Sequence, residues 1–222
     1  MTEPAEADGD AKSMASDVGF LAVPARPEAT RLAEAIRRLA TAAVVTPAGV
    51  EVLEAGAEQL EALATQLEAG AARSRFDGLV PTADGQQPFP LATHPLLGAA
   101  NPLAPPVEVE AVDGVVRGRA RYTPAYEGLA GRLHGGYVAA AFDVVLGYAA
   151  ALTGHAAVTG TLTVKYLRPI PLEADLLYEA DPGRVEGRKL LVQGRLLADG
   201  ETVSEAEAIF IAVPSQRYTS ND

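Results

Sequence analysis

The stretch that decides the fold reads His134-Gly135-Gly136-Tyr137-Val138-Ala139-Ala140-Ala141-Phe142-Asp143. Its two glycines favour a turn, and the small and apolar residues after them predict a helix that begins near Gly135. On that helix Asp143 has only small or apolar neighbours, and no Lys or Arg occurs between Arg132 and Lys165. Because a buried carboxylate without a partner is costly, we expect the chain to use Asp143 for chemistry.

The composition argues against several classes of function. The 222 residues suit one domain with an extension, and a hydrophobic share of 48% is enough for a core. A net charge of −11 argues against nucleic acid or an anionic membrane surface as the main partner. Since the chain has no Cys and only 3 His without ligand spacing, we expect no disulfide, no thiolate nucleophile and no metal site.

The first residues favour a cytoplasmic location. Residues 1–19 are acidic and contain no apolar run, so they predict a disordered segment and neither a signal peptide nor a transit peptide. No later stretch is long and apolar enough to span a bilayer. A tail at 215–222 closes the chain.

Residues 20–75 predict a helical hairpin. The first helix is expected to begin at Pro27, and the second at Pro47 with Thr46 as its N-cap and Gly70 as its end. The apolar stripes of the two helices are expected to meet each other or to cover the main domain. These stripes are Leu32, Ile36, Leu39 and Ala43 in the first helix and Leu53, Leu60, Leu63 and Leu67 in the second. Residues 76–106 follow as a proline-rich connector that we expect to be extended.

Residues 107–214 predict an α+β domain. The segments 107–112 and 115–122 flank Asp113-Gly114, which is a strong signal for a two-residue hairpin turn. Further strands are predicted at 159–168, 176–180, 189–198 and 202–213, and one helix at 135–151. Strands on both sides of a single long helix favour an antiparallel sheet wrapped on that helix.

The start of this helix suits acyl transfer. Free amides at a helix N-terminus can stabilise the negative charge that develops on a carbonyl oxygen, and Gly135 and Gly136 let a substrate approach closely. Asp143 lies about 12 Å further along the helix at 1.5 Å per residue, which leaves room for a water or an acyl carbon. Two alternatives remain open: the glycines as a simple helix-entry turn, and Asp143 as a structurally satisfied acid.

Three features together carry a family resemblance. They are His134-Gly135-Gly136 followed by Asp143, the strand that ends at Arg168-Pro169, and the order of strands and helix. In these features the chain resembles the hotdog-fold acyl-CoA thioesterases, specifically the PaaI-like group. The similarity covers residues 102–214, about half the chain.

This resemblance implies a hotdog fold, in which a curved antiparallel sheet wraps a long helix and subunits pair as a homodimer or homotetramer with active sites between them. It implies that Asp143 is the general base or the nucleophile and that the amides around Gly135 and Gly136 polarise the thioester carbonyl. Thr159 matches a position where some members place a hydroxyl near the attacking water. His134 is expected either to cap the helix or to transfer a proton. The resemblance also implies that the substrate is an acyl-CoA and that no further cofactor is needed.

One position departs from the family pattern. Some relatives carry an Asn six residues before the histidine, where this chain has Gly128. The polar role of that Asn is open to Glu127 or is absent.

Basic side chains near the strand ends are candidate ligands for the phosphates of CoA. They are Arg168, Arg188 and Lys189, for which exposed strand-end charges are the alternative interpretation. We interpret His94 and His155 as solvated loop residues.

Two other functions compete with thioester hydrolysis. One is a hotdog enoyl-CoA hydratase, whose usual histidine loop with a Phe-Pro element is missing before the helix. The other is a non-catalytic acyl-CoA-binding or scaffold protein that uses the helical hairpin as its interaction surface.

Overall fold

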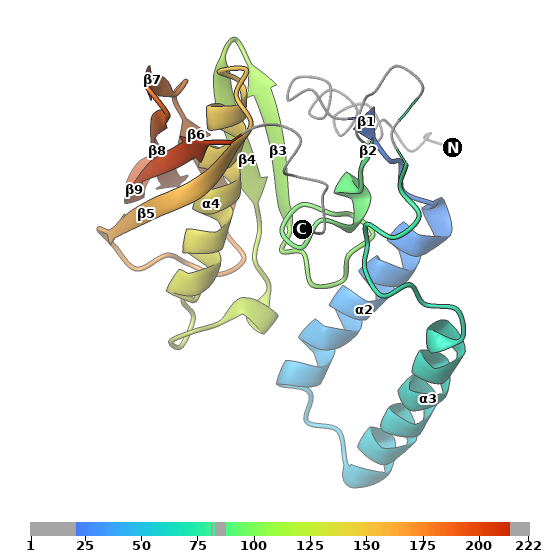
Figure 1. Cartoon of the computed structure of the whole chain (residues 1–222). Helices are drawn as coiled ribbons and strands as arrows, with labels where there is room; N and C mark the ends of the chain where they lie inside the picture. The colour runs from blue at the N-terminus through green and yellow to red at the C-terminus, as the bar shows by residue number, and fades with distance from the viewer. Residues whose placement is uncertain (1–20, 81, 83–87, 214–222) are drawn as a thin grey trace, which may run out of the picture.

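The computed structural model describes residues 21–80, 82 and 88–213. The predictions for residues 1–19 and 215–222 lie outside the described residues. Within the described part, a long helix, α4 (Gly135–Ala151), lies against a curved antiparallel sheet and contacts β4, β5, β6, β8 and β9 (Figure 1). This arrangement confirms the α+β prediction and is the hotdog architecture that the resemblance implies.

The sheet is built from strands close to those predicted. In the order in which they lie side by side, they are β3 (Val107–Val112), β4 (Val115–Ala120), β6 (Leu176–Ala180), β8 (Lys189–Ala198), β9 (Glu201–Ala212) and β5 (Ala157–Tyr166), and β7 (Arg184–Glu186) pairs with β8. The three-residue β7 was missed because it is too short to show alternation.

Two aspartate–glycine pairs close hairpins: the predicted one at Asp113-Gly114 and a second at Asp199-Gly200. Asp113 and Gly114 between β3 and β4 have φ angles of 53° and 79°, and Asp199 and Gly200 between β8 and β9 have φ angles of 51° and 78°. Positive φ at both central residues is the turn geometry that matches the twist of paired strands. The sequence signal for these turns is confirmed.

The core is the contact between α4 and the sheet. Val138, Phe142, Val145 and Leu146 of α4 are all 0% exposed. Two sheet glycines let the helix come this close: a Cβ on Gly118 would lie 2.8 Å from Val145 Cγ2, and one on Gly194 would lie 2.8 Å from Leu146 Cδ2. A fully apolar helix face and small residues beneath it therefore set the depth of α4.

Helix α2 (Pro27–Val45) anchors the N-terminal extension to the domain. Arg37 Nη1 donates to the Asn101 carbonyl at 2.9 Å, and the Thr41 and Thr123 hydroxyls form a hydrogen bond of 2.9 Å beside the turn η2 (Pro124–Tyr126). Ala33 of α2 is 1% exposed. The start at Pro27 is confirmed.

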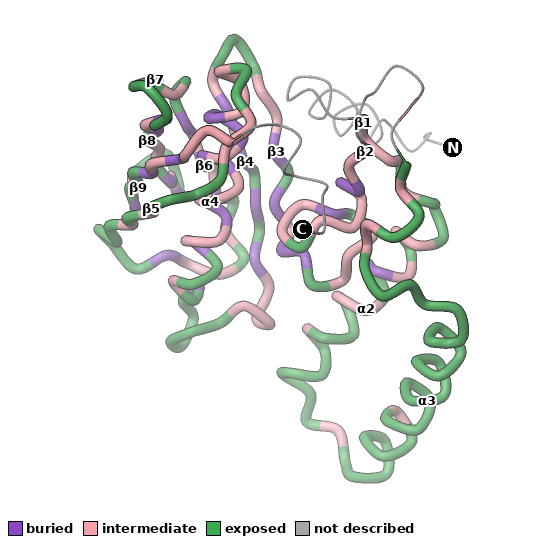
Figure 2. Tube along the Cα trace, in the orientation of Figure 1, coloured by how far each residue is buried: buried purple, intermediate pink, exposed green. Residues whose placement is uncertain are grey.

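Helix α3 (Val50–Glu68) differs from the prediction in two ways. It begins at Val50 with Gly49 as its N-cap, while the Thr46 hydroxyl accepts a hydrogen bond from the Ala48 amide at 3.2 Å instead of capping the helix. None of its described residues is buried, and Figure 2 shows it exposed along nearly its whole length. The expectation that its leucines cover another part of the same chain is wrong: Leu53, Leu60, Leu63 and Leu67 are 50%, 44%, 37% and 53% exposed.

The described part of the connector is more compact than an extended segment. Its strand β2 (Pro88–Phe89) pairs in parallel with β1 (Leu21–Ala22), and a short helix, η1 (Leu91–Thr93), follows. Gly98 closes a tight turn, where a Cβ would lie 2.5 Å from the His94 amide nitrogen. The prolines restrict the backbone but do not prevent this local folding.

Substituting Gly194 tests the packing of α4. In Gly194→Ala the new Cβ would lie 2.6 Å from the Glu179 carbonyl oxygen and 2.8 Å from Leu146 Cδ2. We expect the free energy of unfolding, measured by urea denaturation, to fall by about 1–3 kcal/mol.

Gly147→Ala on α4 is the matched control. Its Cβ would meet Phe210 at an ordinary 3.6 Å, and replacing a helical Gly by Ala is favourable, so stability should stay equal or rise by up to about 1 kcal/mol. Equal losses in both variants would contradict this account.

Candidate active site

His134 caps the start of α4. Its ring Nδ1 accepts a hydrogen bond of 3.0 Å from the Gly136 amide. The capping interpretation of His134 is therefore confirmed, and the Gly136 amide is occupied. The Gly135 amide precedes the first helical hydrogen bond, and no described residue accepts a hydrogen bond from it. Of the two predicted glycine amides, Gly135 is the one open to a ligand.

A short loop before the helix explains the missing Asn. The Gly128 amide donates to the Arg132 carbonyl at 2.9 Å, and the Glu127 carboxylate accepts a hydrogen bond from the Gly131 amide. A Cβ on Gly128 would lie 2.9 Å from His134 Cα, so this loop leaves no room for an Asn side chain there. Glu127 closes the loop.

The side chains of Asp143 and Thr159 meet. Asp143 is half-buried on α4, and the Thr159 hydroxyl of β5 donates to its Oδ1 at 2.7 Å. This bond fixes the orientation of the carboxylate and leaves Oδ2 for another partner. The predicted pair is thus brought together.

A bulge in β5 aims Thr159 at the helix. Thr159 pairs with Phe210 and Thr161 with Ile209, so the register shifts across Gly160. Phe210 faces the core at 3% exposure, and neighbouring residues of β9 point to opposite faces of the sheet. Regular alternation would place Thr159 and Thr161 on the same face, and the bulge instead turns Thr159 inward.

An open cavity of about 750 Å³ lies at the start of α4. Its walls are the loop before the helix and the segment after β5, and they are apolar apart from the helix start and two arginines, Arg132 and Arg168. Arg168 also pairs with Glu201. The lining residues are Gly128, Leu129, Arg132, Leu133, His134, Gly135, Gly136, Tyr166, Leu167, Arg168, Pro169 and Ile170. Asp143 lies two helical turns beyond this lining.

Comparison with known proteins identifies the family. The model of the thioesterase superfamily matches residues 130–205. A crystal structure of a thioesterase superfamily protein is 34% identical to the chain, with a TM-score of 0.74, and the match covers 86% of this chain and 98% of that one. The chain belongs to the thioesterase superfamily.

Relatives of this thioesterase-superfamily chain that carry a specific name match it over a shorter stretch. Acyl-coenzyme A thioesterase THEM4 of Bos taurus is 33% identical over 99 residues, which are 44% of this chain and 40% of the relative. The Mus musculus protein of the same name is 34% identical over 93 residues, which are 41% of this chain and 40% of the relative. The chain thus spans about 40% of the length of these relatives.

The three predicted phosphate ligands do not converge in one chain. Arg168 follows Tyr166, which pairs with Ser204, whereas Lys189 pairs with Ile211. Seven residues of extended strand separate these two positions on β9, or about 23 Å. Arg188 lies beside Lys189 and donates to the Ala212 carbonyl at 3.3 Å. Arg132, which sequence reasoning missed, is the basic residue that shares the cavity with Arg168.

Among the described residues of this superfamily member, no group of His, Cys, Asp and Glu could hold a metal ion. The helices that the structure describes include none with the length and hydropathy of a membrane span.

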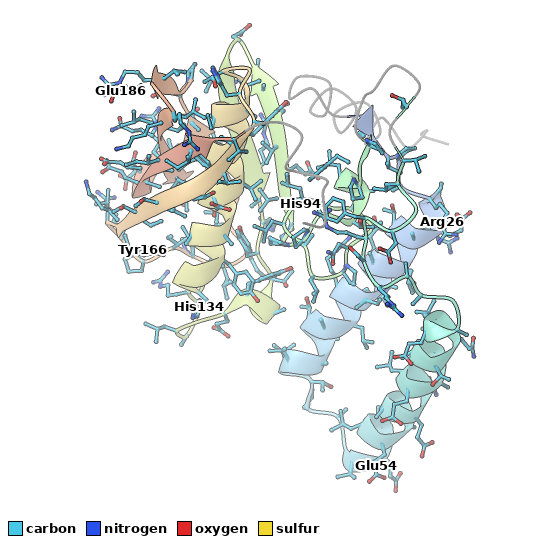
Figure 3. All side chains as sticks on the ribbon, viewed as in Figure 1. Arg26, Glu54, His94, His134, Tyr166 and Glu186 are labelled. Carbon is cyan, nitrogen blue, oxygen red and sulfur yellow. The ribbon has the colours of Figure 1, made fainter. Side chains whose placement is uncertain are left out.

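His94 is not the solvated residue that we expected (labelled in Figure 3). His155 is exposed, as expected. The His94 ring is half-buried, and its Nδ1 accepts a hydrogen bond of 3.2 Å from the Leu96 amide. Its pKa is lowered from 6.5 to about 4, chiefly by burial and in part by the positive charge of Arg75, while the carboxylate of Asp143 opposes the shift. The ring is neutral at pH 7.

His94 should make stability depend on pH. Because the folded state holds the ring near pKa 4 and the unfolded state near 6.5, stability is lost as pH falls from 7 to 4. That difference corresponds to at most about 3 kcal/mol, which solvent screening of the half-buried ring reduces to about 1–2 kcal/mol.

We expect His94→Gln to lose about 1–2 kcal/mol less than the wild type between pH 7 and pH 4 in urea denaturation. His155→Gln, at an exposed site, should lose as much as the wild type. Identical curves for all three proteins would refute the buried, neutral state of His94.

Proposed function

We propose that this protein is an acyl-CoA thioesterase, which hydrolyses an acyl-CoA to the free acid and CoA. The observation that carries the proposal is the 2.7 Å hydrogen bond between Thr159 and Asp143, because it presents an oriented carboxylate on the helix whose free amide end faces a cavity. The relatives named acyl-coenzyme A thioesterase THEM4 support the same reaction.

The Gly135 amide is the group we assign to the thioester carbonyl. Attack on a thioester builds negative charge on the carbonyl oxygen, and a helix N-terminal amide stabilises that charge. Gly136 and His134 support this amide indirectly, because the Gly136 amide donates its hydrogen bond to the His134 ring.

Asp143 serves as base or as nucleophile in this proposal. As a base it takes a proton from a water whose oxygen bonds to the carbonyl carbon. As a nucleophile its own oxygen forms that bond, and water later cleaves the resulting anhydride. In both cases the C–S bond breaks and its electron pair leaves with the sulfur as the thiolate of CoA. The thiolate becomes the thiol by taking the proton that Asp143 holds as a base, or a proton from water when Asp143 is the nucleophile. Thr159 fixes the carboxylate for either role.

Basic side chains at the cavity suit the phosphates of CoA. Arg132 and Arg168 line the cavity, and guanidinium groups form paired hydrogen bonds with phosphate oxygens. Arg188 and Lys189 lie at the other end of the sheet, so in this proposal they reach CoA only from a second subunit. No cofactor beyond the substrate is required.

Two subunits build each site in this proposal. β5 is the last strand of the main sheet and is largely exposed, with Val158 at 45% and Tyr166 at 51%. An exposed edge of this length offers unpaired backbone groups to another strand. Pairing through β5 would give a homodimer, or the building block of a homotetramer, and would place partner residues near Asp143.

The net charge of −11 argues against nucleic acid or an anionic membrane surface as a partner. We further propose a cytoplasmic location.

A non-catalytic scaffold is the second candidate. The exposed leucines of α3 favour it, because an uncovered apolar stripe on a 19-residue helix is typical of an interaction surface.

Asp143→Asn separates the two functions. We expect thiol release from a panel of short, long and aromatic acyl-CoAs to fall at least about 100-fold in this variant, because the amide neither takes a proton nor attacks the carbonyl carbon. Asp175→Asn, a control on a side chain that is 95% exposed, should keep wild-type turnover. Acyl-CoA binding without turnover in the wild type, unchanged in Asp143→Asn, would favour the scaffold.

Dilution tests the shared site. Specific activity should fall as the protein is diluted through the concentration at which analytical ultracentrifugation shows dimers dissociating. A carrier protein in all samples controls for adsorption. A monomer with full activity would exclude an active site built from two subunits.

A further inference from the structure

Tyr166 of β5 forms a hydrogen bond with the start of α4. Its hydroxyl donates to the Gly135 carbonyl at 2.7 Å. Its ring lies so close that a Cβ on Gly135 would be 3.1 Å from the Tyr166 Cζ atom. Figure 3 labels Tyr166 at the end of β5 and His134 at the start of α4. The side chain also lines the cavity that begins there.

The peptide between Gly135 and Gly136 is held at both ends. Tyr166 binds its carbonyl at 2.7 Å, and the His134 ring binds its amide at 3.0 Å. In a planar trans peptide these two groups point in opposite directions, so two partners fix the plane. Glycine needs such partners because its own backbone preferences are weak.

The preceding peptide is fixed as well. The Tyr137 amide donates at 3.0 Å to the His134 carbonyl, which belongs to the same peptide as the Gly135 amide. One peptide earlier, the His134 amide donates to the Tyr126 carbonyl at 3.0 Å. With the peptides on both sides of Gly135 held, the direction of its own amide is determined. Tyr166 is the one of these partners that comes from the sheet.

The strand end that carries Tyr166 is rigidly attached. The Ser204 hydroxyl, 0% exposed, donates to the Lys165 carbonyl at 2.8 Å, and the Leu167 amide donates to the Val203 carbonyl at 2.9 Å. The Tyr166 phenol is protonated at neutral pH and can donate, and its partial burial raises its pKa above the ordinary value.

We propose that Tyr166 is a positioning residue, which aims the Gly135 amide at the thioester carbonyl by holding the Gly135 carbonyl. Its ring forms the adjoining wall of the cavity. The inference rests on the proposed thioesterase function. It assigns to Tyr166 a contribution to the rate of the chemical step that is separate from substrate affinity.

Tyr166→Phe is the direct test, because it removes the hydroxyl and keeps the ring. We expect kcat for thiol release to fall about 10-fold with KM within twofold of wild type, since a misaligned donor loses part of its effect on the transition state. Hydrogen exchange should be faster in the variant for the amides of the first turn of α4.

Ser204→Ala is the matched control. It removes a hydrogen bond at the same strand end that does not touch α4. We expect it to lower the Tm while kcat stays within twofold of wild type.

The outcomes separate the two proposals. A wild type without thiol release would overturn the proposed function and, with it, this assignment. An active wild type with unchanged kcat in Tyr166→Phe would overturn the role of Tyr166 alone. A decrease in kcat of equal size in Tyr166→Phe and Ser204→Ala would also overturn it, because both changes would then act through strand stability.

Discussion

The contact between α4 and the sheet is the constraint on which the rest of the structure depends. The helix buries a continuous apolar face, and Gly118 and Gly194 let it approach the strands closely. Its half-buried side carries Asp143, and the Gly135 amide in its first turn has no acceptor among the residues that the structure describes. The same packing that stabilises the domain therefore sets where a carboxylate and a helix end stand relative to each other.

Much of the domain follows from local sequence. Aspartate–glycine turns and alternating strands predict β3, β4, β6, β8 and β9 because each signal lies within a few neighbouring residues. The site was predictable in the same measure, since His134, Gly135 and Asp143 belong to one helix. Thr159 required the resemblance, and its hydrogen bond to Asp143 agrees with it.

What sequence reasoning missed depends on contacts between distant segments. The bulge at Gly160 turns Thr159 to the inner face of the sheet. Strict alternation predicts the outer face, because it does not allow for an extra residue in the strand. Tyr166 lies on the inner face with Leu162 and Val164, but its bond to Gly135 spans 31 residues. The burial of His94 comes from folding of a connector whose prolines indicated only extension. The exposed leucines of α3 show that an apolar helix face does not by itself predict which surface will cover it.

The bulge in β5 has a consequence for sequence change. On its C-terminal side the strand alternates normally up to Tyr166, and on its N-terminal side Thr159 is out of phase by one residue. The alternation of inward and outward side chains therefore restarts at the bulge, and the two ends of β5 follow it separately. Deleting Gly160 would restore a single phase and leave Thr159 opposite Phe210 and Tyr166 opposite Ser204, so both side chains would still face inward. Pairing with β9, more than the number of residues at this point, keeps both ends of the strand directed at one helix.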